Sequence, residues 1–133
     1  MAGEFAVYVD SFLAAGDLSA YQNRFVKLSA ANTIDVATGG VGAAGDKIVG
    51  VLKNAPDAAG KPCTVQVLGI CEVAMNGNTD IAAGDWIKST ADGIGIKAAT
   101  NLDNVAGQAN GAWTENSTAL VEIILTGPFG LSV

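Results

Sequence analysis

The sequence predicts an all-β fold, and three observations lead to this prediction. From Asn23 onward, short runs of β-branched and aromatic residues alternate with clusters of Gly, Asn, Asp and Ala. The pairs Asp92-Gly93 and Asn76-Gly77 at such clusters are typical of tight turns between antiparallel strands. No long stretch carries the 3.6-residue apolar period of a helix, so at most one short helix is expected. The 133 residues suit a single small domain, which we expect to be a β-barrel or β-sandwich.

Alternating apolar residues and turn signals place the expected strands. These are residues 24–29, 48–53, 63–69, 86–89, 94–97, 105–109 and 119–125. The second and third flank a turn-rich link and predict a hairpin, while Asp92-Gly93 predicts another between the fourth and fifth. Gly69 interrupts the alternation, so we expect a bulge or bend there. Residues 119–125 are the most apolar and should lie in the middle of the core.

The first 22 residues differ in character from the rest, and their pattern leaves helix and strand open. Phe5, Val9, Phe12 and Leu13 would share one face of a helix, whereas residues 5–9 alone could form a strand. We interpret residues 1–22 as an extended N-terminal arm that docks on a partner and residues 23–133 as the β-rich domain. Deleting the arm should then leave a folded protein. The alternative is that the segment is the first strand of the same core.

Composition and charge exclude several classes of function. The net charge of −6 would repel a polyphosphate, so direct nucleic-acid binding is disfavoured. The absence of His removes imidazole base catalysis, His-activated nucleophiles and His-ligated metal sites. Charged residues make up only 15% of the chain, against ~25% in an average soluble domain. This deficit favours a subunit of a permanent assembly, whose interfaces carry few charges.

The remaining sequence features indicate a cytosolic product without a membrane span. No apolar run approaches the ~20 residues that cross a bilayer, and the N-terminus lacks the basic start of a signal peptide. Cys63 and Cys71 lie in apolar segments outside any C-x-x-C motif, so we expect both to be reduced core residues, although a disulfide stays possible at this point.

Two motifs suggest a ligand but do not support one. Residues 40–45 match the spacing Gly-x-Gly-x-x-Gly, yet a strand follows where nucleotide binding requires a helix, and Asp46 would repel a phosphate. The tetrapeptide Ala-Ala-Gly-Asp occurs at 14–17, 43–46 and 82–85, where it is best explained as a repeated turn. The carboxylates are scattered, so we expect no cofactor, no metal and no enzymatic activity.

The order of the predicted elements resembles the capsid decoration, or cement, proteins of tailed bacteriophages. The residues that carry the resemblance are Arg24-Phe25-Val26-Lys27-Leu28, Val49-Gly50-Val51-Leu52, Val65-Gln66-Val67-Leu68-Gly69-Ile70-Cys71-Glu72-Val73, Ile81-Ala82-Ala83-Gly84-Asp85-Trp86-Ile87, Ala91-Asp92-Gly93, Val105-Ala106-Gly107-Gln108-Ala109 and Leu120-Val121-Glu122-Ile123-Ile124-Leu125. The resemblance implies a β-tulip-like fold and a homotrimer that binds the major capsid protein. It also implies a place on the outer surface of the virion and reinforcement of the shell against packaged DNA.

On this hypothesis, large apolar side chains of the arm and one loop aromatic would contact the capsid or neighbouring subunits. The candidates are Phe5, Tyr8, Phe12, Leu13, Tyr21 and Trp113. For Trp113, a packing role over the core is an equal alternative. Two other functions remain open: a β-barrel module that binds a small molecule or carbohydrate, and an enzyme that uses carboxylates alone. Neither has a paired or clustered set of residues to support it.

Overall fold

Strands account for all the regular structure in the described part of the chain. The computed structural model describes residues 5–38, 48–75, 79–98, 104–115, 117 and 120–130, and no helix occurs among them. The strands are β1 (Phe5–Ala14), β2 (Phe25–Ala30), β3 (Thr33–Val36), β4 (Ile48–Leu52), β5 (Pro62–Ala74), β6 (Trp86–Ser89), β7 (Gly95–Lys97), β8 (Asn104–Ala109) and β9 (Leu120–Gly130). The predicted all-β fold is confirmed.

Five of these strands form a closed barrel. Their order is β1-β3-β2-β4-β5, and an additional pairing between β1 and β5 closes the ring. The closing pair is antiparallel and runs from Phe5 opposite Ile70 to Leu13 opposite Pro62, whereas β1 and β3 are parallel. Closure leaves β5 with a neighbour on both sides, so its backbone groups are paired without an exposed edge over this length.

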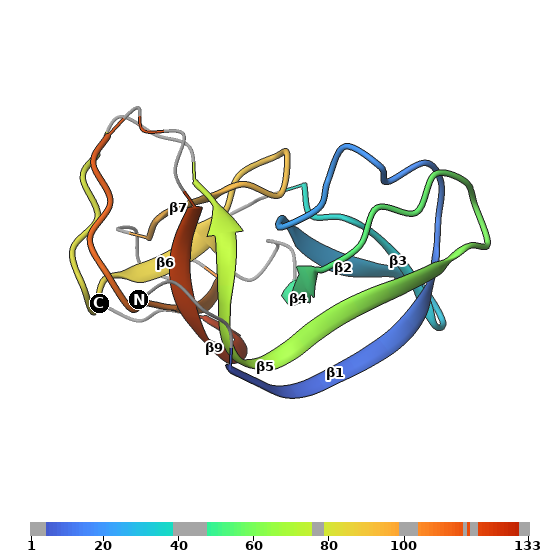
Figure 1. Cartoon of the computed structure of the whole chain (residues 1–133), viewed down its shortest axis with the longest axis horizontal. Helices are drawn as coiled ribbons and strands as arrows, with labels where there is room; N and C mark the ends of the chain where they lie inside the picture. Colours follow the sequence, from blue (N-terminus) through green and yellow to red (C-terminus); the bar gives the residue numbers. More distant parts are fainter. Residues whose placement is uncertain are drawn as a thin grey trace.

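The other strands continue from β5 into a second, incompletely closed barrel, which we call the open barrel. Its order is β5-β9-β8-β6-β7, all antiparallel, and an isolated bridge from Met75 to Gly95 brings β7 back to the end of β5. Figure 1 shows the two barrels side by side, with β5 extending across both of them. The long strand β5 is therefore the structural link between the two halves.

The change from one barrel to the other occurs at Gly69. Before Gly69, the even-numbered residue Gln66 lies opposite Val51 of β4. After Gly69, the odd-numbered residues Cys71 and Val73 belong to the same core cluster as Val51. The side of β5 that faces this cluster thus shifts by one residue, and the positive φ of Gly69 (102°) allows the shift. The predicted break in alternation is confirmed.

A buried amide stabilises this bend. The Gln66 side chain is 1% exposed, and its Nε2 donates to the carbonyl oxygens of Leu68 (3.2 Å) and Ile70 (3.0 Å). These are backbone acceptors on either side of Gly69, so the buried amide has hydrogen-bond partners and links the two sides of the bend.

Two hydrophobic clusters fill the two barrels, and β2 and β4 form the wall between them. The closed barrel holds Ala14, Leu18, Val26, Ile34, Leu52, Cys63 and Val65. The larger cluster includes Ile87, Trp113, Val121, Ile123 and Leu125 from the open barrel, together with Phe25 and Val51. The consecutive pairs Phe25-Val26 and Val51-Leu52 are each divided between the two clusters. Strand β4 and the first two residues of β2 are therefore buried on both faces, which explains their consecutive apolar residues.

The N-terminal segment belongs to the sheet. Residues 5–14 form strand β1 rather than a helix, in agreement with the alternative of a first strand of the core. Ala14 and Leu18 are each 2% exposed in the closed barrel, and Leu18 N donates to Pro56 O at 2.8 Å. Removing residues 1–22 is therefore expected to open the closed barrel, not to leave a folded remainder. Docking of this segment on a partner stays a prediction.

Both predicted hairpins are present. Strands β4 and β5 pair as antiparallel neighbours, and so do β6 and β7 around Asp92-Gly93, where Gly93 has φ of 75°. The Ala-Ala-Gly-Asp copy at 82–85 forms a turn in which Asp85 Oδ2 accepts from Ala82 N at 2.9 Å. The copy at 43–46 and the glycine-rich residues 40–45 lie outside the described residues.

Both cysteines are fully buried thiols outside any disulfide, as predicted, and they occupy different clusters. Burial raises the pKa of Cys63, so little of the reactive thiolate forms at pH 8. We expect iodoacetamide to modify neither residue in the folded protein and both in denaturant without a reductant, as measured by intact mass. Rapid modification of the folded protein would contradict this burial, and failure to modify the unfolded chain would indicate a disulfide.

Candidate docking surface

One face of the closed barrel, without a charge among its described side chains, is the strongest candidate for contact with a partner. The outer face of the β1–β5 pair, called here the outer β1–β5 face, consists of the exposed Ser11, Leu13, Pro62, Thr64 and Leu68, with the buried Gln66 between Thr64 and Leu68 on β5. Ser11 lies opposite Thr64 and Leu13 opposite Pro62, and side chains opposite each other in an antiparallel pair share a face. Residues 5–10 of β1 lie alongside β5, but their side chains lie outside the described part.

Two of the four large exposed hydrophobic residues of the described chain lie on this face. Leu13 is 44% and Leu68 38% exposed, and the other two, Leu28 and Leu120, lie elsewhere at 51% and 39%. Single exposed leucines are ordinary in a soluble protein. Two on one uncharged face are better suited to a protein contact than to a solvated surface.

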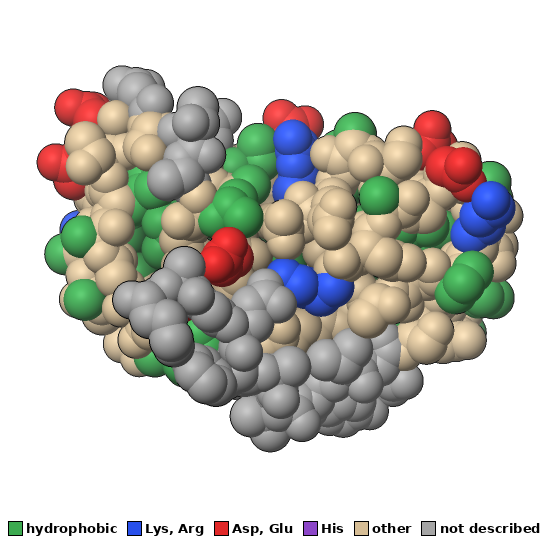
Figure 2. Space-filling model, in the orientation of Figure 1, with side chains coloured by type: hydrophobic (Ala, Val, Ile, Leu, Met, Phe, Trp, Pro, Cys, Tyr) green, Lys and Arg blue, Asp and Glu red, His purple; other side chains and the backbone are tan. Residues whose placement is uncertain are grey.

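The charges next to this face neutralise each other. Lys61 immediately precedes Pro62, and its Nζ lies 2.8 Å from Asp57 Oδ1 in an exposed ion pair. The hydrogen bond from Lys61 holds the pKa of Asp57 below its usual value, so the carboxylate stays ionised in neutral solution. Figure 2 shows exposed hydrophobic side chains at the right-hand end of the molecule, below neighbouring acidic and basic side chains.

Charge is distributed unequally between the two barrels. Among the described side chains, residues 11–68 carry three acidic and four basic groups, whereas residues 69–125 carry six acidic and two basic groups. The closed barrel is thus nearly neutral and the open barrel is acidic. When this protein approaches a second copy or another acidic surface, electrostatic repulsion is weakest if the closed barrel faces that surface.

The outer side of the open barrel shows this acidity directly. Glu72 on β5 lies opposite Glu122 on β9, a like-charged pair that weakens strand pairing unless water or a neighbouring group compensates it. At the end of the same barrel, Asp80 and Glu115 are exposed, and Asp80 Oδ1 accepts from Glu115 N at 2.8 Å. Such a surface is better placed in solvent than in a protein contact.

The structure separates the six contact residues predicted from the sequence. The side chains of Phe5 and Tyr8 lie outside the described part, and Leu13 is exposed on the outer β1–β5 face. Phe12 and Tyr21 are partly buried against the core of the closed barrel. The Tyr21 ring also lies 5.3 Å from the guanidinium carbon of Arg24, so it is engaged within the molecule.

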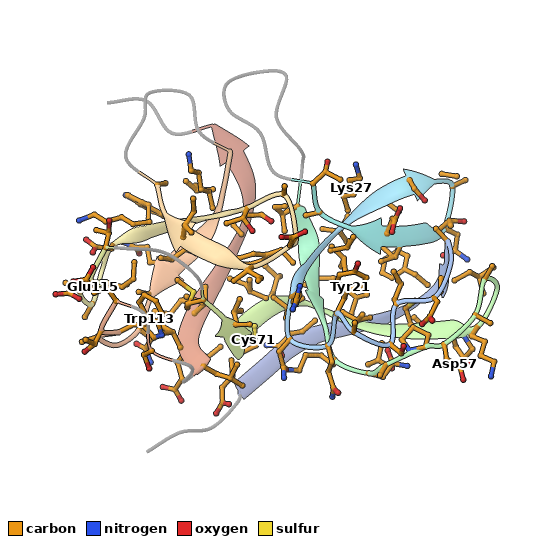
Figure 3. The ribbon with its side chains drawn as sticks, turned by 90° about the horizontal axis from the view of Figure 1, so that it is seen from above. Tyr21, Lys27, Asp57, Cys71, Trp113 and Glu115 are labelled. Carbon is orange, nitrogen blue, oxygen red and sulfur yellow. The ribbon has the colours of Figure 1, made fainter. Side chains whose placement is uncertain are left out.

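For Trp113, the structure supports the packing alternative and not surface contact. Its side chain is 5% exposed, and it belongs to the larger core cluster. Residue 113 pairs with Ile81 through two backbone hydrogen bonds of 2.8 and 2.9 Å, which fix the ring over the end of the open barrel. Figure 3 places Trp113 and Cys71 in one half of the molecule and Tyr21 and Asp57 in the other. This burial favours the packing alternative, and a role of Trp113 in contact with a partner stays an untested prediction.

Leu68 was not predicted from the sequence, because it sits inside a strand whose alternation suggested a single buried face. The signal that could have identified it is the position one residue before Gly69, where the strand bends. In the described part of the chain, no group of three or more His, Cys, Asp or Glu could hold a metal ion. The described residues also contain no helix long and apolar enough to cross a membrane.

Comparison with known proteins gives a structural match without a sequence match. No protein-family model and no curated protein matches the sequence. A crystal structure of the N base of the head fiber protein gp8.5 of bacteriophage phi29 has a TM-score of 0.61 and covers 92% of this chain and 97% of its own. The chain has the fold of this head-fiber base. At 16% identity the likeness concerns the fold alone, and the protein that shares it belongs to a phage head, as do the decoration proteins that the sequence resembles.

Proposed function

We propose that the protein is a structural component of a phage virion, a decoration protein attached to the outer surface of the capsid. The observation that carries this proposal is the match over nearly the whole chain to the head-fiber base. The low charge content, the absence of His and the uncharged outer β1–β5 face support a role in assembly, since each favours contact over catalysis.

Attachment occurs through the closed barrel. Leu13 and Leu68 are buried against the major capsid protein, and the acidic open barrel points into solvent. Burying a leucine stabilises a contact by about 1.5–3 kcal/mol, so two of them give a modest contact after the costs of association. In this orientation the carboxylates of the open barrel stay hydrated, and no unpaired charge is buried.

Three copies act together in the proposed assembly. A homotrimer presents three outer β1–β5 faces, and once one of them is bound, the others bind at a high effective concentration. Modest contacts then add up to durable attachment. Because each trimer touches several capsid subunits, it ties them together and opposes their separation under the pressure of packaged DNA. No residue has to perform chemistry in this role.

Purified heads that lack the protein provide the test. We expect added protein to cosediment with these heads at saturable stoichiometry and to raise the fraction that survives osmotic shock. Native mass spectrometry should give three times the 13.3 kDa chain mass, in solution or after release from heads. A protein that stays monomeric, does not sediment with heads and is missing from virions would contradict the proposal.

A further inference from the structure

The bend between β8 and β9 contains an Asn-Gly sequence beside the paired carboxylates of β5 and β9. Asn110 follows the last residue of β8 and is exposed, and Gly111 follows it. A Cβ built on Gly111 would meet no atom within 4 Å, so the backbone here has open space around it. Asn110 is therefore accessible to water, and the next residue places no side chain against it.

Asn110 is held against one acidic residue. Its backbone N donates to Glu122 O at 2.8 Å, and its Nδ2 donates to Glu122 Oε1 at 3.3 Å. Glu122 in turn lies directly opposite Glu72. The amide of Asn110 is thus a neutral donor to one member of a pair of like charges, a role that a carboxylate at this position could not take over.

We propose that Asn110 is a site of spontaneous deamidation, which converts this favourable contact into a repulsive one. The backbone nitrogen of Gly111 attacks Cγ of Asn110 and forms the N–Cγ bond of a succinimide. The bond from Cγ to the side-chain nitrogen breaks, and this nitrogen leaves as ammonia with the proton of the Gly111 amide. Water then opens the ring at either carbonyl, which yields aspartate or isoaspartate. No oxidation or reduction is involved.

The products disturb the β8–β9 pair at the point where β8 ends and the connecting loop begins. Aspartate at position 110 places a carboxylate beside Glu122, which already lies opposite Glu72, and removes the donor to Glu122 Oε1. Isoaspartate also inserts a methylene into the backbone, one residue beyond the pairing of Ala109 with Ile123. Both changes weaken the β8–β9 pair, so the protein is expected to lose stability as it ages.

The test is timed incubation of the whole protein in mildly alkaline buffer, followed by peptide mapping and an isoaspartate-specific methylation assay. We expect the peptide with Asn110 to gain the mass of an amide-to-acid exchange, and each converted molecule to gain one negative charge beyond the net −6. Peptide mapping separates this event from any change at Asn76-Gly77. An Asn110 peptide that stays unmodified while control peptides of the same sequence convert would overturn the proposal.

The matched control is Gly111→Ala, since an added Cβ meets no atom within 4 Å and the φ of Gly111 lies outside the left-handed region. This variant should fold normally and show most of the conversion lost, because the methyl group hinders attack by the residue 111 nitrogen. Equal conversion in both proteins would contradict the succinimide route.

The consequence is measured with Asn110→Asp against Asn110→Ser, which removes the amide without adding charge. We expect the Asp variant to melt below the Ser variant at neutral pH, and the difference to disappear when the carboxylates are protonated. Equal melting temperatures at neutral pH would show that the added carboxylate does not weaken the hairpin.

Discussion

Replacing Gly50 with alanine is expected to cause one of the largest losses of stability among the glycine-to-alanine substitutions in the described part of the chain. A Cβ at this position would overlap the carbonyl oxygen of Gln66 and lie 2.9 Å from both the Gln66 carbonyl carbon and Val65 Cγ1. Two of these atoms are backbone, so a rotamer change cannot relieve the overlap. Strands β4 and β5 would have to separate where the two barrels join.

We expect a cost of about 3 kcal/mol, at the upper end for overpacking, which corresponds to a fall in Tm of roughly 10 °C for a domain of this size. Thermal unfolding followed by circular dichroism measures it. Gly16→Ala is the control, because an added Cβ there meets no atom within 4 Å. A Gly50→Ala protein as stable as this control would mean that β4 and β5 do not approach so closely.

Much of the strand layout could be predicted from the sequence, because it depends on local chemistry. Asp92-Gly93 specifies a tight turn through the positive φ that only Gly accepts readily, and the apolar run at residues 119–125 identifies a central strand. The break at Gly69 was visible for the same reason. Strand β3 was not predicted, since Thr33–Val36 is short and follows directly after the turn at Asn32.

The division into two barrels could not be predicted, because barrel closure depends on pairs far apart in the sequence. Leu13 lies opposite Pro62, and nothing in either residue specifies the other. The consecutive buried residues Phe25 and Val26 did carry a signal, since a strand buried on both faces reads as a continuous apolar run. Recognising it requires knowing that a second layer covers the barrel.

The candidate docking surface was predicted only in part. Leu13 was identified as a large apolar residue of a segment without an assigned partner, but its orientation became clear only from the register of β1 against β5. Trp113 looked exposed because polar residues surround it in sequence. Its backbone pairing with Ile81, 32 positions earlier, turns the ring into the core.

Charge introduced on the outer β1–β5 face is expected to abolish attachment to the capsid. In the double variant Leu13→Asp, Leu68→Asp, each contact loses a buried leucine worth about 1.5–3 kcal/mol and gains a carboxylate that must be desolvated. Kd for one face should rise by at least about a hundredfold. The loss for a trimer should be larger, since all three faces are weakened together.

The chain provides a matched control for this experiment. Leu28 and Leu120 are exposed to a similar degree, at 51% and 39%, but lie off the outer β1–β5 face. The variant Leu28→Asp, Leu120→Asp carries the same change in charge and hydrophobicity. Both double variants should keep the thermal stability of the parent protein, because all four side chains already contact solvent.

The measurement that tests the account most directly is the binding of these two double variants and the parent protein to purified heads, followed by cosedimentation over a range of concentrations. We predict saturable binding for the parent and for the Leu28, Leu120 variant, and none for the Leu13, Leu68 variant. If the Leu13, Leu68 variant bound heads as tightly as the parent while remaining folded, the outer β1–β5 face would not be the attachment surface.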